Sequence, residues 1–292
     1  MATRFEDFFY TSTDGLKLHA RVYDSPSASA LPAICLPGLT RNSADFHELA
    51  LYLANHPTAP RKVVAFDYRG RGRSSYDPKW QNYDPVVETG DVLAGLTALG
   101  IEHGAFIGTS RGGLIIMILA AMRPAVLKAA VLNDIGPAVD PAGLVQIRAY
   151  LERAPRPKTF TEAVEIQRSI AGEAFAALTD ADLERMVRAF YRDEAGVPVP
   201  DFDPALLNTL KSLDLSKPLP ELWPQFMGLA GIPVLAIRGA NSSLLSAATL
   251  DEMAKRHPNL TTITVEGQGH APLLETGELP ARISEFLADA DA

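Results

Sequence analysis

The stretch of sequence that decides the fold reads Phe106-Ile107-Gly108-Thr109-Ser110-Arg111-Gly112-Gly113. It contains the pattern Gly-x-Ser-x-Gly, with an apolar, strand-like segment before it and an apolar, helix-like segment after it. A serine on such a tight strand-to-helix turn projects its hydroxyl above a parallel sheet, and the flanking glycines leave room for the adjacent strand and helix. The context therefore predicts that Ser110 is a nucleophile at the end of a buried strand.

A serine hydroxyl needs a base that takes its proton, and His270 has the most informative setting among the six histidines. It follows the last expected strand, in the loop Glu266-Gly267-Gln268-Gly269-His270-Ala271-Pro272. It also comes late in the chain, as the order serine, acid, histidine requires. We predict that His270 is the general base, and that the other histidines are surface or packing residues.

Strands and helices are expected to alternate on both sides of this turn. Short apolar runs predict buried strands, and segments with one apolar face predict the helices between them. Two short strands are expected within residues 9–24, around the turn at residues 13–15. The strands expected after them are residues 33–36, 62–66, 105–107, 127–132, 234–237 and 260–265. This alternation predicts the α/β class, with a mostly parallel sheet and helices on both faces.

The alternation of strand and helix patterns stops between residues 137 and 225, where only helical patterns are found. Leu144, Ile147 and Leu151 share one helical face, and Thr159 opens a capping-box pattern. About ninety residues are too many for a plain loop. We therefore expect residues 1–136 and 226–292 to form one core, and residues 137–225 to form an inserted helical cap without strands.

Composition excludes several classes of function. The net charge is −8 and no basic stripe compensates for it, so nucleic acid is not an expected partner. No apolar run approaches the roughly 20 residues of a membrane helix, and the N-terminus lacks the pattern of a signal peptide. The single cysteine, Cys35, suits a reducing compartment. We expect a cytoplasmic protein with a small-molecule substrate, and the sequence leaves a homodimer open.

Four segments together resemble the α/β-hydrolase superfamily. Residues 37–40 are similar to its loop after the third strand, and residues 67–74 to its D-x-R-G-x-G-x-S turn. Residues 108–112 are similar to its nucleophile elbow, and residues 267–272 to its G-x-G-H-x-P loop. The resemblance implies an eight-stranded sheet with a helical cap after the sixth strand, and chemistry without a cofactor or metal. It also implies an oxyanion hole made by the backbone N–H groups of Leu39 and Arg111. Pro37 stands where the family usually has histidine.

The triad acid departs from the resemblance. Relatives usually carry an aspartate after the seventh strand, at the position that Ser243 occupies here. Asp134, at the end of the expected strand 127–132, is the best alternative, because neighbouring strands lie only about 4.8 Å apart. Asp134 could equally be a structural residue that caps the start of the insertion. In a third reading no carboxylate acts, and Ser243 or Asn241 merely orients the histidine.

These residues indicate a serine hydrolase that acts on a small carboxylic ester or lactone through an acyl-enzyme on Ser110. Hydrolysis of a carbon–carbon bond, or perhydrolase and haloperoxidase-like chemistry, would use the same machinery. A non-catalytic small-molecule receptor on the same fold is the alternative from another class, and Ser243 favours it. Aromatic residues of the insertion and its exit would line an acyl pocket or pack in the cap core: Tyr150, Phe190, Tyr191, Trp223 and Phe226.

Overall fold

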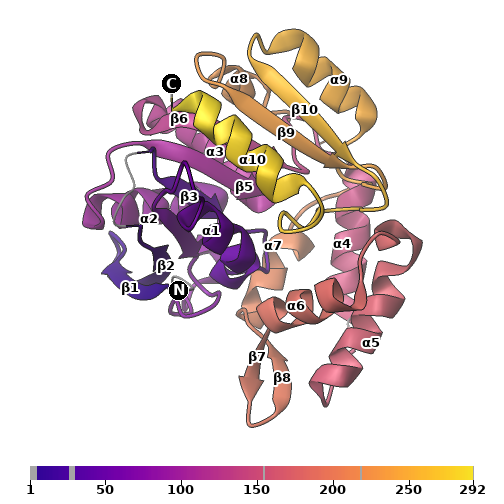
Figure 1. Cartoon of the computed structure of the whole chain (residues 1–292). Coiled ribbons are helices and arrows are strands. Elements are labelled where there is room, and N and C mark those ends of the chain that lie inside the picture. The colour runs from indigo at the N-terminus through magenta and orange to yellow at the C-terminus, as the bar shows by residue number, and fades with distance from the viewer. Residues whose placement is uncertain (1–4, 26–29, 154, 218, 292) are drawn as a thin grey trace.

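One eight-stranded sheet organises the protein (Figure 1), a computed structural model of which describes residues 5–25, 30–153, 155–217 and 219–291. The strand order is β1-β2-β4-β3-β5-β6-β9-β10. β1 pairs antiparallel with β2, and β2 with β4, while all other neighbours are parallel. The strands are β1 Glu6–Thr11, β2 Lys17–Tyr23, β3 Ala33–Leu36, β4 Val63–Asp67, β5 Gly104–Thr109, β6 Leu127–Asn133, β9 Val234–Gly239 and β10 Leu260–Val265. The predicted fold class is confirmed.

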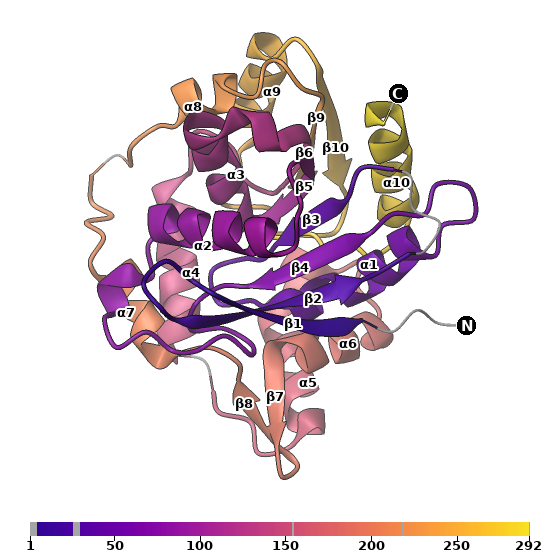
Figure 2. The same cartoon turned by 90° about the vertical axis from the view of Figure 1, so that its left-hand side faces the viewer.

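Helices cover both faces of the sheet (Figure 2). α1 (His47–Ala54) and α10 (Leu279–Ala290) pack on one face. The opposite face carries α2 (Pro85–Ala98), α3 (Arg111–Met122), α8 (Trp223–Met227) and α9 (Ala247–Arg256). Successive side chains of a strand point to opposite faces, so Ala33 and Cys35 join the first layer, whereas Ile34 and Leu36 join the second. Both layers exclude water from the strands that carry the site.

Between β6 and β9 the chain leaves the sheet. It forms α4 (Pro141–Arg153), α5 (Phe160–Ala171), α6 (Asp180–Phe190) and α7 (Leu207–Lys211). Thr159 caps α5 with its hydroxyl, as its capping pattern predicted, and Thr179 caps α6 in the same way. These helices lie beyond the carboxyl ends of the parallel strands (Figure 1). Short 3-10 helices lie at Ser43–Phe46, Trp80–Asn82, Pro124–Val126, Gly172–Phe175 and Pro204–Leu206.

The expectation that the insertion holds no strand was wrong. β7 (Tyr191–Glu194) and β8 (Val197–Pro200) form an antiparallel hairpin. Its two-residue turn is Ala195-Gly196, with φ values of 54° and 88°. A two-residue hairpin turn of type I′ needs positive φ at both central positions, which Asn-Gly or Asp-Gly usually signals and alanine does not. The prolines of β8 further obscured the strand, because proline is confined to edge strands such as this one.

None of the helices in the described ranges is long and apolar enough to cross a membrane.

Candidate active site

Ser110 lies on the tight turn between β5 and α3, with φ 51° and ψ −109°. Positive φ in a non-glycine residue is strained by about 1–3 kcal/mol, and the close packing around the turn maintains it. A Cβ atom on Gly108 would lie 2.5 Å from the Gly112 carbonyl carbon, and one on Gly112 would lie 2.0 Å from the Leu36 carbonyl oxygen. Both glycines are therefore required by contact with backbone, as their positions in the motif predicted.

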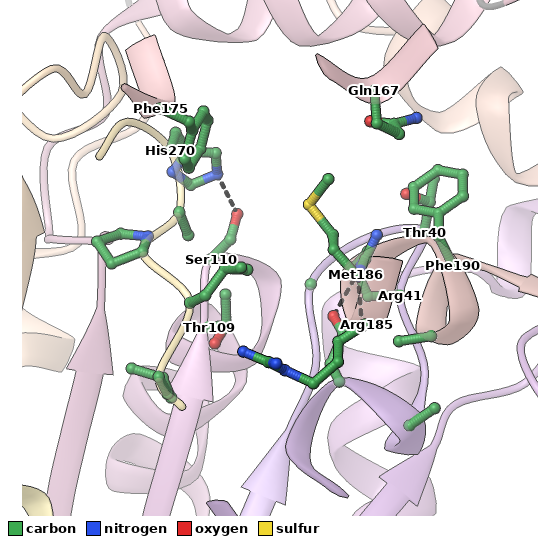
Figure 3. Close-up of a pocket in the computed structure, with 18 of the residues that line it drawn as sticks. Thr40, Arg41, Thr109, Ser110, Gln167, Phe175, Arg185, Met186, Phe190 and His270 are labelled. Carbon is green, nitrogen blue, oxygen red and sulfur yellow. Dashed lines mark hydrogen bonds and ion pairs between the residues drawn. The ribbon is translucent and has the colours of Figure 1, made fainter. Parts of the chain in front are cut away.

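His270 faces this serine. Its Nε2 atom lies 3.0 Å from Ser110 Oγ (Figure 3). The loop that carries His270 is held from two sides: Gln268 Oε1 accepts a hydrogen bond from Leu273 N–H at 2.9 Å, and Asn133 Nδ2 donates to the Pro272 carbonyl at 2.9 Å. These contacts fix the ring at the distance that proton transfer requires.

Asp134 lies behind the histidine, one residue beyond the end of β6. Its side chain is fully buried, and its Oδ2 atom lies 2.7 Å from His270 Nδ1. The same oxygen accepts a hydrogen bond from Ser242 Oγ at 2.6 Å, while Oδ1 accepts one from Gly239 N–H at 2.8 Å. Asp134 has a φ of 55°, and its own N–H donates to the Ile237 carbonyl at 2.7 Å. β6 and β9 thus supply the carboxylate and its donors together.

Ser243, at the position where relatives usually carry the acid, lies outside this chain of hydrogen bonds. Its hydroxyl donates to Gln146 Oε1 of α4 at 2.8 Å. Asn241 instead donates to the carbonyls of Glu173 and Ala174. Neither residue orients the histidine, whereas Ser242, which sequence reasoning missed, contacts the carboxylate. The one feature of the sequence that could have pointed to Ser242 is its position after β9, next to the place where the acid was expected.

The two residues expected to form an oxyanion hole flank the nucleophile. Arg111 opens α3, where the first N–H groups of a helix have no intrahelical acceptor. Leu39 follows β3, the strand beside β5, and a Cβ atom on the preceding Gly38 would lie 4.0 Å from Ser110 Cβ. Within the described ranges, neither the Leu39 N–H nor the Arg111 N–H has a hydrogen-bond acceptor. Both donors are therefore free for a ligand.

A cavity of about 750 Å³ opens in front of the serine and histidine. Ser110 and His270 lie on one side of it, while Arg41, Gln167 and Phe190 lie on the other (Figure 3). The wall combines the core with helices α4, α5 and α6 of the insertion. Within the described ranges, no group of three or more histidine, cysteine or acidic residues could hold a metal ion.

The aromatic residues separate into two groups. Tyr150 and Phe190 line the cavity. Tyr191 packs in the small core of the insertion, and Phe226 is completely buried under the sheet. Trp223 packs against that same main core, with the Arg256 guanidinium over its ring. The sequence could not separate these two groups, because both follow the same helical spacing.

The far wall of the cavity carries charge. Arg41 binds Asp45 through two hydrogen bonds of 2.6 and 2.5 Å and lies over the Phe190 ring. Burial raises the pKa of the nearby Glu275 carboxyl to about 7; Asp45 adds to this effect, and Arg185 and Arg41 oppose it. Burial in the cavity wall is thus the main reason why the pKa of Glu275 lies above the ordinary carboxyl value.

A mostly parallel sheet with a serine, a histidine and an aspartate joined above its carboxyl edge is typical of one class of enzyme. A model of the alpha/beta hydrolase fold matches residues 32–276, so the chain belongs to the alpha/beta hydrolase family. Relatives named as esterases, lipases and other hydrolases support its assignment as a hydrolase.

Three relatives illustrate the similarity. A 3-hydroxybutyrate-oligomer hydrolase from Cupriavidus necator is 31% identical over 87% of this chain and 88% of its own length. A 2-(acetamidomethylene)succinate hydrolase from Mesorhizobium japonicum is 25% identical over 80% of this chain and 79% of its own. The crystal structure of an alpha/beta hydrolase from Novosphingobium aromaticivorans covers 99% of both chains, with 37% identity and a TM-score of 0.89.

Proposed function

We propose that the protein is a carboxylic-ester hydrolase that works through an acyl-enzyme on Ser110. One observation carries the proposal: Ser110 Oγ lies 3.0 Å from His270 Nε2, and His270 Nδ1 lies 2.7 Å from Asp134 Oδ2. This is the relation of nucleophile, base and orienting acid that activates a serine hydroxyl.

In the first half-reaction, Ser110 Oγ attacks the ester carbonyl carbon while His270 takes the hydroxyl proton. The carbonyl oxygen becomes an oxyanion and accepts hydrogen bonds from the Leu39 and Arg111 amides. Asp134 keeps the ring in the tautomer that can accept the proton, and stabilises the imidazolium that forms. His270 then returns the proton to the leaving alcohol. Water repeats the sequence on the acyl-enzyme and releases the acid.

The proposed substrates are small esters whose acyl part fits the cavity, lactones included. A volume of about 750 Å³ accommodates more than a single acetyl group. The relative from Cupriavidus necator is named for hydrolysis of 3-hydroxybutyrate oligomers. Short hydroxyacyl esters are therefore the first substrates to test, together with p-nitrophenyl acetate and butyrate.

Two measurements test the proposal. Purified protein should hydrolyse p-nitrophenyl butyrate or a 3-hydroxybutyrate dimer, and a fluorophosphonate should form its adduct on Ser110. Ser110→Ala should lose both activities while remaining folded. Ester turnover that survives this substitution, or wild-type protein that hydrolyses none of these esters, would contradict the proposal.

A further inference from the structure

A buried chain of ion pairs lies behind the nucleophile. Glu88, on α2, is completely buried and bridges two guanidinium groups. Its Oε1 atom accepts a hydrogen bond from Arg71 Nη1 at 2.6 Å, and its Oε2 atom accepts one from Arg111 Nε at 2.7 Å. One carboxylate thus joins the turn after β4 to the first residue of α3.

Both guanidinium groups also donate to backbone carbonyls, and Arg71 does so twice: its Nη1 atom donates to the Arg69 carbonyl at 2.7 Å. Arg71 Nε donates to the Leu39 carbonyl at 2.8 Å. Arg111 Nη2 donates to the Tyr83 carbonyl at 2.8 Å. Leu39 and Arg111 are the residues whose amides are proposed to bind the oxyanion. Glu88 is therefore linked to both of them, directly to one and through Arg71 to the other.

The backbone of Leu39 is held on both sides. The Gly38 carbonyl accepts a hydrogen bond from Arg41 N–H at 3.2 Å, and the Leu39 carbonyl accepts the bond from Arg71. A peptide unit is planar, so the bond to the Gly38 carbonyl also fixes the direction of the Leu39 N–H. Releasing Arg71 would free the second of these two anchors.

The electrostatics keep the network charged. Burial alone would raise the pKa of the Glu88 carboxyl, but the guanidinium groups of Arg111 and Arg71 hold it below its ordinary value. The two guanidinium groups share this one carboxylate, so its charge holds both of them in place. Without that charge both ion pairs are lost, and the guanidinium groups keep only their hydrogen bonds to backbone carbonyls.

We propose that Glu88 is a positioning residue that sets the geometry of the oxyanion hole. It holds Leu39 through Arg71 and the first turn of α3 through Arg111. The inference rests on the proposed function, and it concerns stabilisation of the transition state rather than binding of the ester. Loss of the Glu88 charge should therefore lower kcat and leave KM nearly unchanged.

A matched control separates positioning from general stability. Asp91 lies three residues further along α2, is 3% exposed, and accepts hydrogen bonds from Arg69 Nε and Nη2 at 2.7 Å each. Among the described residues, the Arg69 side chain forms no hydrogen bond with Leu39, Arg71 or Arg111; only its backbone carbonyl accepts one from Arg71 Nη1. Asp91→Asn therefore removes a buried charge from the same helix without touching the oxyanion hole.

The experiment measures kcat and KM per folded molecule for p-nitrophenyl butyrate, and inhibition by a trifluoromethyl ketone with the same acyl chain. Ser110 Oγ adds to the ketone carbon, His270 takes the proton, and the ketone oxygen becomes an oxyanion in the hole. For Glu88→Gln we expect kcat to fall about 10- to 100-fold, with the inhibition constant rising by a similar factor. Asp91→Asn should keep both within about threefold and lower only the melting temperature.

A second variant keeps the test decisive if Glu88→Gln does not fold. Arg111→Met removes a guanidinium that is 11% exposed, and it retains both the backbone amide and the Arg71–Glu88 pair. It should lower kcat and ketone affinity together and leave KM nearly unchanged. Equal losses in the Glu88 and Asp91 variants, or an unchanged ketone affinity in Glu88→Gln and Arg111→Met, would refute the inference alone. Wild-type protein that neither hydrolyses esters nor binds the ketone would refute the proposed function as well.

Discussion

Replacing Asp134 by asparagine tests the proposed triad sharply, because the structure dictates how the new amide must turn. In the native site, Oδ1 accepts a hydrogen bond from Gly239 N–H at 2.8 Å, and Oδ2 faces His270 Nδ1 at 2.7 Å. A backbone N–H can only donate, so the amide oxygen of the asparagine must face Gly239. Its NH₂ group then points at His270, and the Ser242 hydroxyl rotates to accept.

This orientation forces the wrong tautomer. An imidazole that accepts a hydrogen bond at Nδ1 carries its proton on Nε2, which then cannot take the proton of Ser110. We expect kcat to fall about 10⁴-fold, the size of the same change in serine proteases. Such a loss corresponds to about 5 kcal/mol of transition-state stabilisation.

The assay compares wild type, Asp134→Asn and Ser242→Ala in ester hydrolysis and in the rate of fluorophosphonate labelling, with circular dichroism to confirm folding. Ser242→Ala removes one of the three hydrogen bonds to the carboxylate but keeps its charge, so we expect a loss of less than about tenfold. An Asp134→Asn variant that is folded and within tenfold of wild type would refute the reasoning about the acid.

Three further predictions concern neighbouring features. Ser243→Asp should leave ester hydrolysis within about threefold, since Ser243 contacts Gln146 and not the histidine; a sharp rise would show that the native site lacks its acid. Burial raises the pKa of Glu275 to about 7, so the folded state binds more protons than the unfolded one below that pH. The contribution of Glu275 to stability should therefore fall as pH rises from the ordinary carboxyl range to about 7, and a pH series in which the difference in melting temperature between wild type and Glu275→Gln stays constant would contradict this. Gly112→Ala would place a Cβ atom 2.0 Å from the Leu36 carbonyl oxygen and should prevent folding, so a normal melting curve for this variant would contradict the packing argument. A Cβ atom on Gly90 would meet nothing within 4 Å, so Gly90→Ala should raise the free energy of unfolding by about 0.5–1 kcal/mol in chemical denaturation.

The elbow could be predicted from sequence because its constraints are local. Gly108, Ser110 and Gly112 are a few residues apart, and the apolar segments around them give the strand and the helix. The position of His270 followed from its loop and its place in the chain. The class of the sheet followed from the alternation of elements in the same way.

The acid depended on geometry that sequence does not carry. Asp134 contacts His270 because β6 and β9 pair in the register Asn133 to Ile237, and because the positive φ of Asp134 turns the chain there. A shift of this register would place the carboxylate elsewhere. The sequence therefore left Asp134 with two nearly equal readings. The hydrogen bonds to His270 and Gly239 show where its carboxylate lies, and the Asp134→Asn variant tests whether it acts as the acid.

The buried position of Glu88 could have been predicted from the sequence, although no such prediction was made. Glu88, Val92 and Leu96 are spaced by four residues and share the buried face of α2. A carboxylate on an apolar helical face needs a buried partner, because an unpaired charge is costly there. The partners, Arg71 and Arg111, come from two other segments, so the sequence could indicate that a buried ion pair exists but not which residues form it.

The insertion and the oxyanion network meet at one turn. The Gly70 carbonyl accepts a hydrogen bond from Asp203 N–H at 2.7 Å, and Gly72 N–H donates to the Asp201 carbonyl at 3.1 Å. Between them, Arg71 and Phe202 form an antiparallel bridge. The inserted segment therefore holds the backbone of Arg71 in place, and the Arg71 side chain in turn holds the Leu39 carbonyl. Because α4, α5 and α6 of the same insertion line the cavity, the segment that shapes the cavity also holds the turn from which Arg71 reaches the Leu39 carbonyl.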